Sequence, residues 1–391
     1  MSAKPQPIEG LNRILVVKLA DLGDAILATS AIAALRAAYP HARIDVLTTA
    51  NGATAFRLCP ALDRIIEIDK HAFDDPRGLI NPVNASGLAW KIARLRFTRY
   101  GAVVLLQHLT TSFGALKYRW LCRAIGAPMR VGLDNGQGTF LTHRAIDYGF
   151  GAKSVHEYNL DVVAQLGAVT DGARPLIVIP ERAQQSAGRL LNKHGVVQPY
   201  IVIHPSVGGY SSARNWPAER FTEVAHLIRS KTGYQVLLVG ANDATEAARQ
   251  ICASTEVINL VGTTTFEELT AVINGAKLVI GSDSSVTHLA AATAIPTLAI
   301  FGPSNHNAWK PVGAMVLSAQ TTELPKSSAV VVRSDIPCSP CFYSGYALGR
   351  REGCPLRTCL DQVSASRITQ IALHILATNR ADETATLSSE Y

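Results

Sequence analysis

Residues 279–311 combine small, polar and acidic side chains in an order that could bind a phosphorylated ligand. The stretch predicts a buried strand at residues 278–280, a polar turn at residues 281–285 and a small-residue helix carrying His288. Such a turn offers backbone N–H groups and the positive end of a helix dipole to a phosphate. Ser284 and Ser285 add hydroxyl donors, and Asp283 can accept hydrogen bonds from sugar hydroxyls. This chemistry fits a nucleotide diphosphate-sugar held at the carboxyl edge of a parallel sheet. For His288, a satisfied and partly buried histidine is the competing interpretation.

A second polar loop follows the strand predicted at Tyr200–His204 and carries Ser206, Ser212 and Arg214. A cation there would act on a leaving diphosphate, which gains negative charge in the transition state. The competing interpretation is a solvated loop arginine. Trp216, two residues later, is assigned to core packing.

Asp24 follows Leu22 and Gly23 in the turn after the first predicted strand. Displacement at an anomeric carbon needs a base that takes the proton of the attacking hydroxyl, and a carboxylate at a strand end can do this. The alternative is an acidic residue that merely stabilises a helix N-terminus. Gly23 would allow close backbone approach or a positive φ angle. Lys18, at the strand end, would hold an anionic acceptor group or be an exposed lysine.

Hydrophobic periodicity places these residues on alternating strands and helices. Strands are predicted in the first half at Arg13–Lys18, Arg43–Thr48 and residues 64–68, 102–106 and 130–131. Strands are predicted in the second half at Tyr200–His204, Thr297–Phe301 and residues 235–239, 257–259 and 278–280. Helices are predicted at residues 24–39, 53–58, 81–99, 114–125, 181–194, 218–232, 245–253 and 266–274. This alternation predicts a doubly wound parallel α/β sheet in each half.

The length of 391 residues predicts two domains. We expect an N-terminal domain over residues 1–180 and a C-terminal domain over residues 181–363, both Rossmann-like and facing a central cleft. Residues 364–391 would form a C-terminal helix, over residues 364–377, and a disordered polar tail from residue 378.

The net charge of +7 is concentrated in the first half. Residues 1–180 hold 20 Lys and Arg against 14 Asp and Glu, whereas the remainder holds 17 against 16. The excess is either a solvated surface or an attraction to an anionic acceptor or acidic lipid headgroups. Nucleic acid is not expected as a partner, because aromatic residues make up only 6% and no recognition motif is visible. With no membrane-span pattern and no signal-peptide layout, the default expectation is a cytoplasmic protein.

Four of the seven cysteines form a C-x2-C-x12-C-x4-C pattern at Cys338, Cys341, Cys354 and Cys359. This spacing is compatible with a tetrahedral thiolate site for a structural Zn or Fe. Reduced free cysteines are the alternative, and disulfides are disfavoured in the cytoplasm. No catalytic role is assigned to this cluster.

Three blocks of the chain, over residues 13–48, 203–228 and 281–311, resemble the glycosyltransferase family 9 enzymes, the ADP-heptose:lipopolysaccharide heptosyltransferases. The resemblance extends over residues 12–376. It implies a GT-B fold with the acceptor on the N-terminal domain and the nucleotide-sugar on the C-terminal one. It also implies inversion at the anomeric carbon without an obligatory active-site metal or other cofactor.

The resemblance also implies roles for individual residues. Asp24 matches the family's catalytic base in the LGD motif, with Lys18 and Gly23 on the acceptor side. Arg214 stands where some members have lysine, which keeps the charge but changes its geometry. The donor-binding residues implied are Ser206, Ser212, Arg214, Asp283, Ser284, Ser285 and His288. Related autotransporter heptosyltransferases bind iron through late cysteines, which supports the metal interpretation of the cysteine cluster.

The resulting hypothesis is a cytoplasmic glycosyltransferase that moves a heptose-like sugar from an ADP-sugar to a lipopolysaccharide inner-core acceptor. Its partners would be the ADP-sugar donor, an anionic glycolipid acceptor and, peripherally, the inner membrane. Two alternatives stay open: a protein O-heptosyltransferase, which only the cysteine cluster supports, and a non-catalytic nucleotide-binding module with a cysteine metal site.

Overall fold

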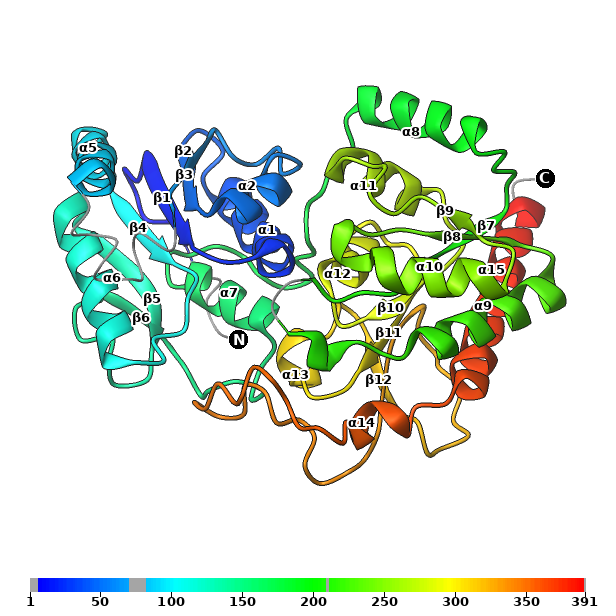
Figure 1. Ribbon diagram of the computed structural model, residues 1–391. Coiled ribbons are helices and arrows are strands. Elements are labelled where there is room, and N and C mark those ends of the chain that lie inside the picture. The colour runs from blue at the N-terminus through cyan, green and yellow to red at the C-terminus, as the bar shows by residue number, and fades with distance from the viewer. Residues whose placement is uncertain (1–5, 70–81, 209–210, 390–391) are drawn as a thin grey trace. The chain divides into compact units, whose positions relative to one another are not determined.

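The computed structural model describes residues 6–69, 82–208 and 211–389, which fall into two units, Met1–Val178 and Ile179–Tyr391. Each unit is built around a parallel sheet covered by helices (Figure 1). Among the described residues, no helix is both long enough and apolar enough to cross a membrane.

The described part of the first unit contains a six-stranded parallel sheet in the order β3-β2-β1-β4-β5-β6. Its strands are β1 (Arg13–Lys18), β2 (Arg43–Thr48), β3 (Arg64–Glu67), β4 (Ala102–Leu105), β5 (Met129–Asp134) and β6 (His143–Ile146). Its helices are α1 (Leu22–Ala38), α2 (Ala50–Phe56), α5 (Pro82–Phe97), α6 (Ser112–Ile125) and α7 (Val155–Ala164). The strand order reverses between β1 and β4, so the carboxyl ends of these two strands flank a topological switch point, where open α/β sheets bind ligands.

The described part of the second unit contains a seven-stranded parallel sheet in the order β12-β13-β11-β10-β7-β8-β9. Its strands are β7 (Tyr200–His204), β8 (Gln235–Leu238), β9 (Ile258–Asn259), β10 (Val279–Ser282), β11 (Thr297–Phe301), β12 (Met315–Ser318) and β13 (Ala329–Arg333). Its helices are α8 (Glu181–Lys193), α9 (Ala218–Thr232), α10 (Thr245–Ser254), α11 (Phe266–Asn274), α12 (Ser285–Ala292), α13 (His306–Trp309), α14 (Thr358–Asp361) and α15 (Ala365–Ser389). The switch point here lies between β7 and β10.

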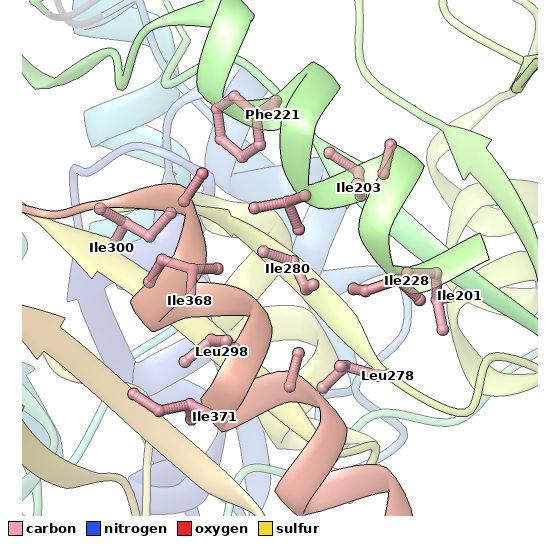
Figure 2. Packing of buried hydrophobic residues seen from close by; sticks show 14 of the residues in the cluster. Ile201, Ile203, Phe221, Ile228, Leu278, Ile280, Leu298, Ile300, Ile368 and Ile371 are labelled. Carbon is pink, nitrogen blue, oxygen red and sulfur yellow. The ribbon is translucent and has the colours of Figure 1, made fainter. Parts of the chain in front are cut away.

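The main core of the second unit lies where α9 and α15 pack on one face of its sheet. Figure 2 shows Phe221 and Ile228 of α9 and Ile368 and Ile371 of α15 gathered around strand residues such as Ile280. Trp216 belongs to the same core: it is buried, donates its indole N–H to the Val363 carbonyl at 3.1 Å and meets Phe221 edge-on. Its assignment to packing agrees with this environment.

The predicted fold class of two doubly wound parallel α/β units is confirmed. Several strands, β1, β2, β7 and β11 among them, begin and end at the predicted residues. The sequence interpretation missed β6, β12 and β13. The tail prediction is wrong, because α15 continues from Ala365 to Ser389 instead of ending near residue 377. Asn81, predicted to begin a helix, and residues 390–391 of the tail lie outside the described residues.

Candidate functional site

The carboxyl edge of the second sheet gathers most of the residues predicted to bind a donor. Asp283 follows β10 and is buried, and its carboxylate accepts a hydrogen bond and ion pair from Arg214 at 3.1 Å. Arg214 also donates to the carbonyls of Asp283 at 3.3 Å and Val207 at 3.1 Å, so it fastens the loop after β7 to the end of β10. With its side chain only 16% exposed, the guanidinium is a positioned cation and not a solvated one.

Ser284 and Ser285 stand at the N-terminus of α12, the helix predicted after the polar turn. Ser284 is the N-cap residue, but it forms no side-chain capping bond. Its hydroxyl instead pairs with Nδ1 of His204 at 3.1 Å. The first N–H groups of a helix have no intrahelical acceptor, so this uncapped first turn can bind an anion. His288 lies one turn further along α12 and is buried.

Ser206 and Ser212 occupy different environments in the loop after β7. The Ser206 hydroxyl donates to the Asp243 carboxylate, which also accepts from the Gly208 N–H at 3.1 Å. Ser212 is exposed and begins a short 3-10 helix, Ser212–Arg214. The structure thus ties Ser206 to Asp243 and leaves Ser212 at the surface.

A cavity of about 300 Å³ opens beside this cluster, wholly within the second unit. Its polar lining includes Ser206, Asn215, Asp243, Glu246, Gln250, Arg357 and Asp361. Within the described part of the chain, the buried Oδ1 of Asn215 has no hydrogen-bond donor. Asn215 and Asp243 were not predicted as site residues, and only their positions after strands β7 and β8 could have suggested them.

His204 ends β7 and was also missed, because its sequence context is that of a buried strand. Burial lowers the pKa of its imidazole from 6.5 to about 4, although the negative charge of Asp243 acts in the opposite direction. The imidazole is therefore neutral at physiological pH. A neutral ring presents one N–H donor and one acceptor nitrogen, so it can orient the Ser284 hydroxyl without adding charge.

Lowering the pH from 7.5 to 5.0 should reduce the free energy of unfolding by about 2 kcal/mol through His204 alone. The imidazole titrates near 6.5 in the unfolded chain and near 4 in the folded one. The unfolded state therefore takes up the proton first as the pH falls through this window. Urea unfolding at both pH values should show a smaller loss for His204→Gln than for the wild type. If the two proteins lost the same free energy of unfolding, His204 would not be the source of this pH dependence. The pKa of His306 is also about 4, so its contribution stays the same in both proteins.

At the carboxyl edge of the first sheet, Asp24 and Lys18 lie on consecutive elements. Asp24 is half-buried in the first turn of α1, directly after β1. Lys18 is buried, and its ammonium donates to the Leu106 carbonyl at 2.9 Å, beside the end of β4. The interpretation of Lys18 as an exposed strand-end lysine is therefore wrong. Gly23 lies inside α1 and not among the glycines with positive φ, so of its two predicted uses the positive φ is wrong, and close backbone approach stays a prediction.

Sequence reasoning missed a histidine–carboxylate pair at this same edge. His108 follows β4 and Asp147 follows β6, and Nδ1 of His108 lies 3.0 Å from the Asp147 carboxylate. Burial alone would raise the pKa of Asp147, but the hydrogen bond and charge of His108 hold it below its ordinary value. Nε2 of the neighbouring Gln107 is buried and, in the ranges described, has no acceptor. His108 and Asp147 lie far apart in the sequence, so no local pattern could have predicted this pair.

The four late cysteines do not assemble into a metal-binding set. All four are free, and only Cys359 is buried. Burial, and then the neighbouring thiols of Cys341, Cys354 and Cys338, raise the pKa of Cys359 to about 11, so it favours the protonated thiol. Across the described ranges, no three His, Cys, Asp or Glu side chains converge as metal ligands. The predicted Zn or Fe site is not supported by this geometry.

The chain is similar to known glycosyltransferases in sequence and in structure. The family description "Glycosyltransferase family 9 (heptosyltransferase)" matches residues 91–347. "Lipopolysaccharide heptosyltransferase 3" of Escherichia coli is 28% identical over 300 residues, which cover 74% of this chain and 83% of that protein.

Two solved structures have the same fold over nearly the whole chain. The glycosyl transferase family 9 protein of Veillonella parvula superposes with a TM-score of 0.72 at 22% identity, covering 95% of this chain and 99% of that one. The ADP-heptose lps heptosyltransferase II of E. coli gives a TM-score of 0.68 at 20% identity, covering 94% and 99%. These similarities establish the GT-B fold. Because the family match spans more than half of the sequence, this chain belongs to glycosyltransferase family 9, the heptosyltransferase family.

Proposed function

We propose that this glycosyltransferase moves a heptose from ADP-heptose to a hydroxyl of the lipopolysaccharide inner core. The main structural support for an ADP-sugar donor is the Arg214–Asp283 ion pair beside the uncapped first turn of α12. A diphosphate needs a fixed cation and N–H donors, and both are present there. The name of the E. coli relative supports the acceptor half.

The donor would bind the second unit in two parts. Its diphosphate would contact Arg214 and the N–H groups of Ser285 and the residues after it. Ser284, oriented by His204, would donate its hydroxyl, and Asp283 would accept from a sugar hydroxyl. The nucleoside would enter the cavity lined by Asn215, Asp243 and Glu246, whose oxygens suit the hydroxyls of ribose and the amino group of adenine. Ser212 and His288 remain weaker candidates, because one is exposed and the other buried in α12.

The acceptor would bind the first unit at the switch point of its sheet. Lys18, Gln107 and His108 offer an ammonium, an amide donor and an imidazole there, which suit an anionic sugar. Gly23, next to Asp24 in the first turn of α1, has no side chain and would allow the acceptor to approach the backbone there.

Transfer would be a direct displacement that inverts the anomeric carbon. The acceptor oxygen forms the new bond to this carbon as the bond to the diphosphate oxygen breaks. Asp24 takes the proton of the attacking hydroxyl, and ADP leaves with the bonding electron pair. Arg214 stabilises the charge that grows on the leaving diphosphate.

A protein hydroxyl is the less favoured acceptor. The cysteine cluster is the only feature that supports it, and these cysteines do not form a metal-ligand set. A glycolipid acceptor would also place the enzyme at the cytoplasmic face of the inner membrane, with peripheral contact to the bilayer.

Calorimetric titration should show ADP binding at least tenfold more tightly than UDP or GDP. The reason is the orphan acceptor Asn215 Oδ1, which can pair with the adenine amino group. Uracil and guanine present a carbonyl oxygen at the equivalent edge and would leave this buried acceptor unpaired. Asn215→Leu should reduce the discrimination. Preference of the wild type for UDP would overturn the proposed donor.

A further inference from the structure

Helix α6 exposes an apolar stripe on the side that faces away from the core of the first unit. Phe113, Leu116 and Trp120 are spaced three and four residues apart and are each at least half exposed. This spacing places them on one face of a helix. Leu121, Cys122 and Ile125 of the same helix are buried in the core against the sheet. Packing within this unit therefore explains the inner face of α6 but not the outer one.

The neighbouring helix α5 has the same two-sided character. Ile92 and Leu95 join the same core as α6, whereas Trp90 is 61% and Phe97 is 83% exposed. The two helices lie side by side at the margin of the first unit (Figure 1). Five large apolar side chains are thus exposed on adjacent helices. Single exposed apolar residues are ordinary, but a cluster of this size marks an interaction surface.

The charged side chains that α5 and α6 themselves carry are all positive, and one acidic residue of β3, Glu67, lines a groove beside Trp90. Residues 82–133 contain eight Lys and Arg and no Asp or Glu. The Arg94 guanidinium lies 5.1 Å from the ring centre of Trp90, and the Lys117 ammonium lies 5.4 Å from that of Phe113. Cations and aromatic rings therefore share one surface. A groove of about 500 Å³ near the ends of the two helices adds Arg96 and Arg99 beside Phe97.

This combination distinguishes between kinds of partner. A second copy of the chain would bring a like-charged face against it, which is repulsive. Helices that rest on a membrane surface pair an apolar face of Trp, Phe and Leu with flanking Lys and Arg, which meet anionic headgroups. We propose that the outer face of α5 and α6, defined by Trp90, Phe97, Phe113, Leu116 and Trp120 with their flanking basic residues, docks on an anionic lipid bilayer. This inference rests on the proposed function in one respect: a lipid-linked acceptor would lie at the membrane, where the enzyme would have to reach it.

Co-sedimentation with vesicles tests the docking surface directly. The wild type should bind vesicles of phosphatidylglycerol and phosphatidylcholine and should bind pure phosphatidylcholine at least tenfold more weakly. Arg119→Gln/Arg123→Gln should weaken binding to the anionic vesicles about thirtyfold, since each basic residue near such a surface contributes about 1 kcal/mol. Phe113→Ser/Trp120→Ser should weaken it at least tenfold by removing the inserted side chains.

Matched controls separate this surface from general charge and polarity. Arg182→Gln/Arg189→Gln changes two exposed arginines of α8 and removes the same net charge from the second unit. Val197→Ser removes an apolar side chain that is 68% exposed elsewhere. Both controls should bind anionic vesicles like the wild type. Equal loss in the controls, or no loss in the α6 variants, would overturn the proposal, as would a shift in oligomeric state caused only by the α6 variants.

Calorimetric ADP binding, measured on the same proteins, keeps the two proposals apart. The α6 variants should bind ADP like the wild type. If no protein binds ADP but vesicle binding depends on α6, the donor proposal fails and the docking surface stands. If ADP binds normally and the α6 variants bind vesicles like the wild type, only the proposal of the docking surface is wrong.

Discussion

Asp24→Asn is expected to lower the turnover number about a thousandfold while leaving the affinity for ADP unchanged. The amide keeps the size and hydrogen-bonding reach of the carboxylate but cannot accept the proton of the attacking hydroxyl. Asp24 lies in the first unit, whereas the residues proposed to hold ADP lie in the second. Initial rates of ADP release with a heptose acceptor, together with calorimetric ADP binding, measure the two quantities separately.

Asp21→Asn is the matched control for this experiment. Asp21 is the exposed N-cap residue of α1, three positions before Asp24, and its side chain forms no capping bond. Both substitutions remove one negative charge near the same helix N-terminus. The control should keep at least a third of the wild-type turnover. If both variants lose activity equally, the charge near α1 matters rather than proton transfer, and the assignment of Asp24 as base is wrong.

Arg214→Gln is expected to reduce kcat/KM about a hundredfold and to weaken ADP binding about tenfold. The guanidinium would be lost from the diphosphate site, and the buried Asp283 carboxylate would lose its cation. The effect on kcat/KM is the larger, because the leaving group carries more charge in the transition state than in the bound donor. Steady-state kinetics with varied donor and calorimetry with ADP measure the two effects.

Two further variants separate the charge of Arg214 from its geometry. Arg214→Lys keeps the positive charge, but a lysine ammonium cannot bridge Asp283 and the Val207 carbonyl as the forked guanidinium of arginine does. Its activity should therefore lie between those of Arg214→Gln and the wild type. Arg229→Gln removes another ion-paired arginine of the same unit, on α9, and should leave kinetics unchanged. Wild-type kinetics in Arg214→Gln would remove Arg214 from the donor site.

The strands were the most predictable part of the fold. β1 and β7 are runs of Ile, Leu and Val whose side chains are buried on both faces, so composition alone marks them. β13 is equally buried, but it follows a long irregular segment without a helical pattern before it, so the alternation that revealed the other strands was missing. The continuation of α15 past residue 377 was missed because the polar residues there were interpreted as a tail.

The alternating α/β order, the polar turns after β1, β7 and β10, and the candidates Asp24, Arg214 and Asp283 could all be predicted from the amino-acid sequence. These features are local: each depends on residues within one strand–turn–helix segment. Four features became visible only in the folded chain: Arg214 pairs with Asp283, His204 contacts Ser284, His108 contacts Asp147, and Lys18 is buried. The four late cysteines likewise do not form a metal-ligand arrangement, although their spacing in the sequence was compatible with one. Contacts between residues distant in the chain depend on strand order and burial, and neither can be predicted from the spacing of side chains along one segment.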